Sequence, residues 1–312
     1  MTSTCTEFGP MIVVLGPTAT GKSSLGISLA RKLGGEILAC DSTQIYRHFD
    51  IGTAKVPAPE QQGIPHHLID LLEPNEVFTA GEYRRQALAV LKDLRPMGKV
   101  PVITAGTGLY LRALLEGLAE APARSEELRE RLRQAARERG PEHLHRVLAR
   151  LDRDTAARIA RRDSQKVIRA IEMRILTGKA VGDIHRAGRE PLQGYRITKI
   201  GLLPERAGLY ARIDARVRAM IAAGWIDEVR RLIEMGVPAD AKPFEFIGYS
   251  QLREHVEGRL PLETAIQKIQ QATRNFAKRQ ITWFRRESSV TWLSGFGDDP
   301  SIASEALKLA AA

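Results

Sequence analysis

Cysteine is nearly absent from this chain of 312 residues, which has only Cys5 and Cys40. Two thiols make neither a disulfide framework nor a cysteine-rich metal cluster, so both are expected to be reduced, with Cys40 buried at the end of an apolar segment. No apolar run approaches the roughly 18 residues that a membrane-spanning helix needs, and the N-terminus lacks the basic region and long apolar core of a secretory signal. We therefore expect a cytoplasmic protein.

Acidic residues are outnumbered, with 37 Asp and Glu against 47 Lys and Arg and a formal net charge of +10. Most of the excess lies between residues 124 and 190, where 18 basic residues face 11 acidic ones, a net of +7. One interpretation is a separate unit that binds nucleic acid, and the other is a solvated, Arg-rich helical surface. The length and the hydrophobic content of 43% predict a sizeable core and two lobes.

The chain does contain a phosphate-binding pattern, which consists of Gly16, Pro17, Thr18, Ala19, Thr20, Gly21, Lys22 and Ser23. An apolar run precedes this phosphate loop and a helical pattern follows it, which is the context that such a loop requires. Glycines let the backbone curl around an anion, N–H groups and a helix N-terminus point at it, Lys22 adds a positive charge and Ser23 can hold Mg²⁺. The pattern predicts a site for a phosphate or diphosphate group.

Strand and helix patterns alternate in the first part of the chain. Strands are expected at 11–15, 36–40, 100–104 and 197–203, and helices at 24–33, 81–94, 209–223, 226–235, 250–257 and 262–286. Apolar residues at helical spacing from 125 to 177 predict an all-helical insertion, followed by a loop at 178–193. The expected fold is α/β, with a P-loop NTPase-like parallel sheet core flanked by helices (residues 1–118 and 195–312) and a helical insertion domain (residues 119–194).

The position of the acids separates this chain from most phosphoryl-transfer enzymes with such a loop. Those enzymes end a core strand with an Asp that orients Mg²⁺, whereas the strand at 100–104 runs into Ala-Gly-Thr-Gly. The strand at 36–40 does end in Asp41, and a carboxylate at the carboxyl end of a parallel strand lies over the ligand crevice. Asp41 is therefore the candidate general base, with a turn-capping role as the alternative.

Several segments, in order along the chain, resemble the successive motifs of the tRNA dimethylallyltransferase family, also called tRNA isopentenyltransferase. They are the phosphate loop, DSTQIYR at 41–47, DIGTAK at 50–55, PHHLID at 65–70, GTGLY at 106–110, DSQKVIRA at 163–170, IGY at 247–249 and the run from Thr273 to Phe284. The resemblance covers nearly the whole chain. No Cys/His-rich extension follows Trp292, so a bacterial-type enzyme is expected.

The resemblance implies transfer of a dimethylallyl group from dimethylallyl diphosphate to N6 of the adenine at tRNA position 37, giving N6-dimethylallyladenosine and diphosphate. The phosphate loop then holds the leaving group, with Mg²⁺ as the cofactor on Ser23. A carbon–oxygen bond breaks rather than a phosphorus–oxygen bond. The reaction therefore does not require an Mg²⁺-orienting Asp after the strand at 100–104. Asp41 matches the family's base, and Thr107 matches a residue near the base and the diphosphate.

The same resemblance implies a monomer that contacts the anticodon stem-loop of tRNA. The residues that match tRNA-contacting positions are Asp41, Ser42, Thr43, Gln44 and Thr107 in the core, and Arg129, Gln165, Lys166, Val167, Ile168 and Arg169 in the insertion. For Lys166 and Arg169, a solvated helix face is the alternative. Arg212 and Arg216 flank the position of an arginine that meets the diphosphate, and Arg216 is favoured.

Two further segments suggest roles of their own. His66 and His67 have no carboxylate or cysteine at metal-ligand spacing, so we expect them in a loop that shapes the substrate site rather than in a zinc site. Basic residues at helical spacing from Arg274 to Arg286 predict a helix that packs by one face and touches RNA with the other, or else a plain surface helix.

Two other functions would use the same loop. A small-molecule or nucleotide kinase would bind ATP there and use Asp41 as the base for a hydroxyl group, and an RNA-binding NTPase switch would transfer no group. The missing acid after residue 104, the size of the basic insertion and the ordered series of motifs count against both.

Overall fold

The computed structural model describes residues 8–119, 122, 124–186 and 189–311. The chain divides into two compact units, residues 1–114 with 193–312 and residues 115–192. None of the described helices is long and apolar enough to cross a membrane. Cys40 is a buried free thiol, as expected, whereas Cys5 lies outside the described residues.

The first unit is built on a parallel sheet of six strands in the order β3-β2-β4-β1-β5-β6. The strands are β1 (Gly9–Leu15), β2 (Glu36–Cys40), β3 (His66–His67), β4 (Pro101–Ala105), β5 (Tyr195–Leu202) and β6 (Val290–Leu293). Because both faces of a parallel sheet are covered, β2 is buried at every position and reads as a continuous apolar run after its first residue. All four strands expected from the sequence are present, and the short edge strands β3 and β6 were not expected.

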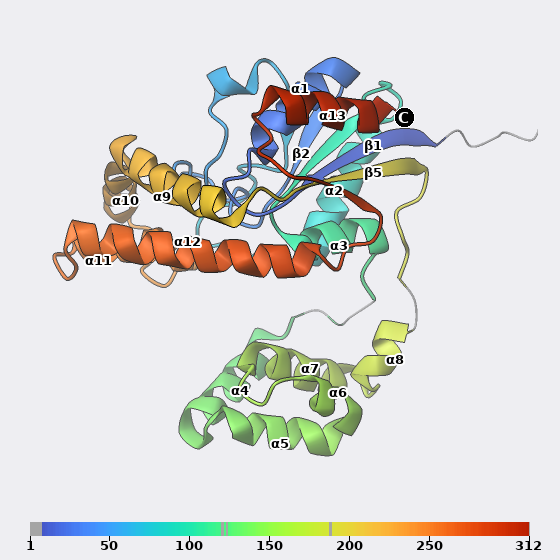
Figure 1. The fold of residues 1–312 in the computed structure, drawn as a ribbon. Coiled ribbons are helices and arrows are strands. Elements are labelled where there is room, and N and C mark those ends of the chain that lie inside the picture. The colour runs from blue at the N-terminus through green and yellow to red at the C-terminus, as the bar shows by residue number, and fades with distance from the viewer. Residues whose placement is uncertain (1–7, 120–121, 123, 187–188, 312) are drawn as a thin grey trace, which may run out of the picture. The chain divides into compact units, whose positions relative to one another are not determined.

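Helices cover both faces of this sheet (Figure 1). The helices α1 (Lys22–Leu33) and α13 (Pro300–Ala311) lie on one face, where Leu25 and Ile302 share a core with Ile12 of β1. The helices α2 (Ala80–Leu94) and α3 (Gly108–Glu116) lie on the other face, where the rings of Tyr83 and Tyr110 stack 4.6 Å apart. These layers confirm the expected α/β class.

A second cluster of helices in this unit forms the wall opposite the carboxyl ends of the strands. It comprises α9 (Arg206–Ala222), α10 (Trp225–Glu234), α11 (Tyr249–Val256) and α12 (Leu262–Phe284), with the short 3₁₀ turn η2 (Lys242–Glu245). A second 3₁₀ turn, η1 (Ala58–Gln61), lies in the segment between β2 and β3. Phe49, Trp225 and Tyr249 lie together in its core. This packing joins the loop after β2 to helices far along the chain.

The second unit is all-helical, as expected. Its helices are α4 (Glu126–Arg139), α5 (Pro141–Leu151), α6 (Arg153–Arg158), α7 (Ser164–Thr177) and α8 (Val181–Arg186). Side chains from α5 and α7, among them Leu144, Leu148 and Ile171, form its core. The expectation of a plain loop at 178–193 is wrong, because Val181 and Ile184 of α8 are buried against this core.

Candidate active site

The phosphate loop connects β1 to the N-terminus of α1, and its two glycines are fixed by backbone geometry. Gly21 has φ +81°, and a Cβ there would lie 2.8 Å from Oδ1 of Asp298 and 2.9 Å from the backbone N of Gly297. Gly16 has φ +148°, and its Cβ would lie 2.7 Å from the carbonyl oxygen of Leu202. Any side chain would therefore push the loop away from its neighbours, which explains both glycines of the pattern.

Hydrogen bonds within the phosphate loop stabilise its curved backbone. The hydroxyl of Thr20 and the ammonium of Lys22 both donate to the carbonyl of Pro17, at 2.9 and 2.8 Å. Residues Thr18 to Ser23, including Ala19, line a cavity of about 1100 Å³, whereas Gly16 and Pro17 do not. We call this space the larger cavity.

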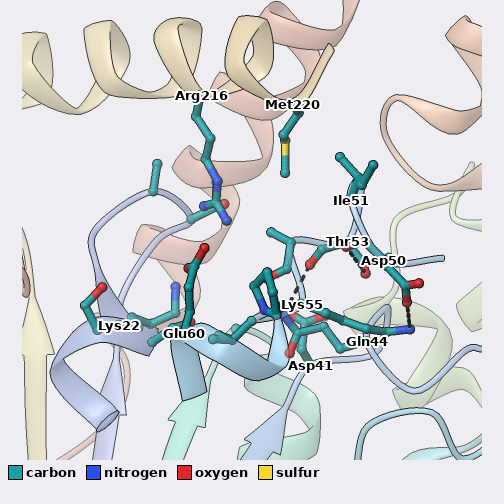
Figure 2. Close-up of a pocket in the computed structure, with 18 of the residues that line it drawn as sticks. Lys22, Asp41, Gln44, Asp50, Ile51, Thr53, Lys55, Glu60, Arg216 and Met220 are labelled. Atoms are coloured by element: carbon teal, nitrogen blue, oxygen red, sulfur yellow. Dashed lines mark hydrogen bonds and ion pairs between the residues drawn. The ribbon is translucent and has the colours of Figure 1, made fainter. Parts of the chain in front are cut away.

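Two cations without a carboxylate partner face the larger cavity. Burial, together with the nearby Arg216, lowers the pKa of Lys22 to about 8, although Asp41 partly offsets this shift. Burial also lowers the pKa of Arg216, with a further contribution from Arg212. No carboxylate among the described residues forms an ion pair with either group. Figure 2 shows Arg216 extending from α9 toward Lys22, so both positive charges are available to an anionic ligand.

Arg212 differs from Arg216 in this respect. Its guanidinium donates to both carboxylate oxygens of Asp298, at 2.8 and 2.7 Å, and lies 4.6 Å from the ring centroid of Phe296. Its charge is thus already balanced. The geometry favours Arg216 as the arginine that meets an anionic ligand.

Asp41 follows β2 and lies beside the loop that follows β4. Its Oδ1 accepts hydrogen bonds from the backbone N–H and the hydroxyl of Thr43, at 2.9 and 2.7 Å. Its Oδ2 lies over Gly106, where a Cβ would be only 2.4 Å away, and no described residue donates to Oδ2. The carboxylate is therefore held by one oxygen and has the other available to accept a proton.

Thr107 adjoins Asp41 because β2 and β4 are neighbouring strands. The N–H groups of Gly106 and Thr107 both donate to the carbonyl of Cys40, at 3.0 and 2.9 Å. The hydroxyl oxygen of Thr107 accepts from the backbone N–H of Ser42 at 2.9 Å. The two candidate catalytic residues are thus brought together at the carboxyl edge of the sheet.

A smaller cavity of about 330 Å³ also borders Asp41. Its wall includes Ser42 and Thr43, together with Phe246, Phe276 and Arg279. Gln44 lines only the larger cavity. The residues that line both cavities are Thr18, Ala19, Lys22, Asp41, Thr53, Ala54, Arg216 and Met220. The two spaces therefore meet at a carboxylate and two cations.

Gln280, on α12, is a residue whose role the sequence did not suggest. This buried amide accepts a hydrogen bond from the backbone N of Thr18 and donates one to the carbonyl of Gly106, both at 2.8 Å. One side chain thus ties the phosphate loop to the loop beside Asp41. Its only sequence signal was its place in the run from Thr273 to Phe284.

Glu228, on α10, was also missed. Its buried carboxylate accepts hydrogen bonds from the backbone N–H groups of Asp50 and Ile51, at 3.0 and 2.8 Å, and from the hydroxyl of Tyr249 at 2.6 Å. These bonds fix the segment that leads to Thr53 and thus the wall shared by the cavities. Nothing in the local sequence distinguishes this glutamate from those on the surface.

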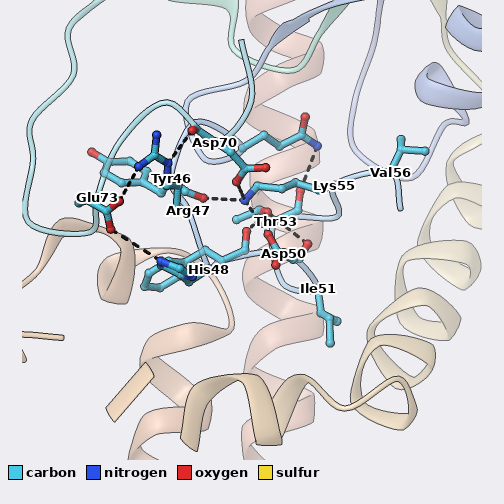
Figure 3. A network of polar contacts seen from close by, with 12 residues as sticks. Tyr46, Arg47, His48, Asp50, Ile51, Thr53, Lys55, Val56, Asp70 and Glu73 are labelled. Atoms are coloured by element: carbon cyan, nitrogen blue, oxygen red, sulfur yellow. Dashed lines mark hydrogen bonds and ion pairs between the residues drawn. The ribbon is translucent and has the colours of Figure 1, made fainter. Parts of the chain in front are cut away.

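The same segment is anchored on its other side by Lys55, as Figure 3 shows. The ammonium of Lys55 donates to the carbonyl of Tyr46 at 2.6 Å and to the carboxylates of Asp50 and Asp70, at 2.7 and 2.5 Å. The charge of Lys55 is therefore balanced by two carboxylates of the protein itself. Among the described residues, Lys22 and Arg216 remain the cations of the larger cavity that have no carboxylate partner.

The candidate tRNA contacts of the second unit fall into two groups. Gln165 and Lys166 are exposed, with Lys166 paired to Asp163. The side chains of Val167 and Ile168 lie in the helical core, so any contact of these two residues with tRNA would have to involve their backbone.

Arg129 and Arg169 are engaged by a buried carboxylate. Arg129 donates to both oxygens of Glu172, at 2.9 and 2.8 Å, and Arg169 donates to Oε2 of the same residue. Burial alone would raise the pKa of Glu172, but these hydrogen bonds and one from the backbone of Ser125 lower it to about 2. Both arginines thus stabilise the fold of this unit.

The two histidines do not lie where the sequence placed them. They form the edge strand β3, where Nδ1 of His66 lies 2.8 Å from the carbonyl of Ile64 and Nε2 of His67 lies 2.7 Å from Glu36. Neither residue lines the two cavities. The interpretation of this pair as a loop that shapes the site is therefore wrong.

Comparison with known proteins identifies relatives over nearly the full chain. The IPP transferase family model matches residues 44–287. The tRNA dimethylallyltransferases of Solibacter usitatus and Koribacter versatilis are 52% and 50% identical, each over 96% of this chain and 97% of the relative.

Solved structures agree with these relatives. A full-length tRNA isopentenylpyrophosphate transferase from Bacillus halodurans is 34% identical, with a TM-score of 0.70 over 97% of this chain and 94% of that one. A eukaryotic dimethylallyltransferase acting on tRNA is 25% identical, with a TM-score of 0.80 over 94% of this chain and 75% of that one.

Proposed function

The chain belongs to the IPP transferase family and transfers a dimethylallyl group to tRNA, and we propose that the donor is dimethylallyl diphosphate and the acceptor atom is N6 of adenine 37. The products are then N6-dimethylallyladenosine and diphosphate. The observation that carries this proposal is the meeting of two cavities at Asp41, Lys22 and Arg216.

The larger cavity suits the donor. Its wall holds the N-terminus of α1, the N–H groups of the phosphate loop and the two unpaired cations, which together bind a diphosphate. Negative charge grows on the diphosphate as the carbon–oxygen bond breaks. Fixed positive groups in a buried site stabilise such charge without having to reorganise, so Lys22 and Arg216 favour departure of the leaving group.

Ser23 fits a role in holding Mg²⁺. This residue lines the larger cavity at the start of α1, and the described residues hold no group of three or more His, Cys, Asp or Glu side chains that would form a protein-only metal site. Mg²⁺ at phosphate sites usually takes one or two protein oxygens and completes its shell with phosphate and water. When bound, the ion supplies further positive charge to the diphosphate.

The smaller cavity suits the acceptor base. Enzymes that modify a base extrude it into a pocket, and a space of about 330 Å³ bordered by Asp41, Phe246 and Phe276 can take one. The exocyclic amine is a weak nucleophile, so Asp41 accepts its proton through Oδ2 as the amine attacks the donor. Thr107 supports this step by fixing the backbone beside Asp41.

No comparable structural observation supports the alternative function of a kinase. Kinases with this loop usually orient Mg²⁺ with an acid at the end of a neighbouring strand, whereas β4 is followed by Gly106 and Thr107. We also propose that the chain acts as a monomer, because residues of a single chain line both cavities. Light scattering at working concentration tests this state.

The decisive experiment incubates the purified protein with unmodified tRNA and with either labelled dimethylallyl diphosphate or labelled ATP. We expect label on the tRNA from the prenyl donor alone, with N6-dimethylallyladenosine in the nuclease digest. A tRNA with guanine at position 37 is the matched control and should stay unlabelled. Turnover of ATP without labelled tRNA would overturn the proposal, and label on the control tRNA would overturn the assignment of position 37.

A further inference from the structure

Trp283 is an exposed aromatic side chain whose role the reaction does not explain. It lies on α12 and is 38% exposed, although most large apolar side chains of this unit are buried. Its indole packs against Gly108, where a Cβ would lie only 2.1 Å from the ring. The next residue, Leu109, is also 48% exposed. The indole is thus supported on one side by backbone and open to solvent on another.

The position of Trp283 relates it to the smaller cavity. Phe276 and Arg279 line that cavity, and Trp283 follows them by seven and four residues on the same helix. Residues at this spacing share one face of a helix, and four residues rise about 6 Å along its axis. Trp283 therefore lies one turn beyond the cavity wall, and Gly108 beneath it adjoins Thr107.

The surface around Trp283 is basic. Lys278, Arg279, Arg285 and Arg286 are all exposed, and none forms an ion pair with a carboxylate among the described residues. Open cations beside an exposed aromatic ring suit a strand of nucleic acid, because phosphates meet the cations and a base stacks on the ring. An apolar protein partner would have no need of these charges.

We propose that Trp283 is a stacking platform for the unpaired tRNA nucleotide that adjoins the extruded adenine. The inference rests on the proposed function, since it needs a base already held in the smaller cavity. The neighbouring base leaves the anticodon-loop stack when the adenine is extruded, and the indole face replaces the stacking that it loses. Trp283 thereby helps to hold the loop open while the reaction proceeds.

Steady-state kinetics with unmodified tRNA test this role. Trp283→Ala should raise KM for tRNA about tenfold, which is the effect of losing one base stack. KM for dimethylallyl diphosphate and kcat should change less than about twofold. Trp283→Phe retains a smaller ring and should restore most of the affinity.

Fluorescence gives a second readout that does not depend on turnover. The chain has three tryptophans, and stacking on a base should quench Trp283 when tRNA is added. Trp283→Phe should lose the share of the quenching that comes from Trp283 and keep only that of Trp225, which lines the smaller cavity. The control Trp292→Phe, which alters the tryptophan that packs against Gly201, should retain the full quenching.

Three outcomes would overturn the inference: an unchanged KM for tRNA in Trp283→Ala, an equal rise in KM for both substrates, or full quenching in Trp283→Phe. Failure of the wild-type protein to label tRNA would instead refute the proposed function. The two failures are therefore distinguishable.

Discussion

The lowered pKa of Lys22 predicts that use of the donor weakens at alkaline pH. Burial and the nearby Arg216 place this pKa at about 8 in the free protein. A diphosphate against the ammonium raises the pKa again, because an opposite charge favours the charged form. Donor binding above pH 8 must therefore take up a proton, and kcat/KM for dimethylallyl diphosphate should fall as the pH rises.

The magnitude follows from the fraction of charged Lys22. With a pKa of about 8, roughly nine-tenths of the Lys22 side chains are protonated at pH 7 and about one-tenth at pH 9. Since kcat/KM for the donor reports the enzyme form to which the donor binds, it should fall about tenfold between these pH values at a fixed, low concentration of tRNA.

Folding stability should change in the opposite direction. The folded pKa of about 8 lies below the ordinary value of 10.5, so the unfolded chain binds more protons between these pH values. The contribution of Lys22 to the free energy of unfolding therefore increases with pH, by about 3 kcal/mol across this window. Deprotonation of Lys22 at alkaline pH therefore lowers kcat/KM without unfolding the protein.

The assay measures kcat/KM for the donor from pH 7 to 9 at constant ionic strength, with thermal unfolding followed in parallel. Lys22→Met should have a low value that no longer depends on pH in this range. A flat profile for the wild-type protein, or an unchanged slope in Lys22→Met, would refute the assignment of the titration to Lys22.

Three other predictions concern single carboxylates or arginines. Asp41→Ala should lower kcat at least a hundredfold and leave KM for tRNA within about threefold, and an equal loss of tRNA binding would make Asp41 structural. Arg216→Gln should raise KM for the donor about ten- to a hundredfold, against less than threefold for the control Arg212→Gln, and equal effects would remove the distinction between them. Glu172→Gln should lower the Tm of the protein at pH 7, since the depressed pKa of Glu172 contributes about 3 kcal/mol that is lost only as the pH falls from 4.5 toward 2. An unchanged Tm would contradict the structural role of Glu172.

Local sequence is sufficient for the parts of this fold that neighbouring residues determine. The phosphate loop is an example, since the glycines that need φ of +148° and +81° lie within eight consecutive residues. The strands β1 and β2 are another, because residues 11–15 and 37–40 are unbroken apolar runs. The edge strands β3 and β6 have two and four residues, and only pairing with β2 and β5 makes them strands. A pattern read along the chain cannot supply that pairing.

The site itself depends on pairs of residues that are remote in sequence. Gln280 binds the backbone of Thr18 across 262 positions, and Glu228 binds Ile51 across 177. Residues so far apart in sequence leave no local pattern from which either contact could be predicted. The arginines of the insertion show the opposite difficulty, because charge composition alone cannot say whether Arg129 meets a phosphate or a carboxylate. In the structure Arg129 forms an ion pair with the buried carboxylate of Glu172.

The charges at the junction of the two cavities explain why a phosphate loop serves carbon chemistry in this proposal. As the amine attacks the donor carbon, positive charge develops on nitrogen and negative charge on the departing diphosphate. Asp41 is the acid of the shared wall, and Lys22 and Arg216 are its cations, so each developing charge has a fixed partner of opposite sign. A phosphoryl transfer would instead need further positive charge around phosphorus and an acid to orient Mg²⁺ there. The arrangement therefore favours a reaction in which the diphosphate leaves intact.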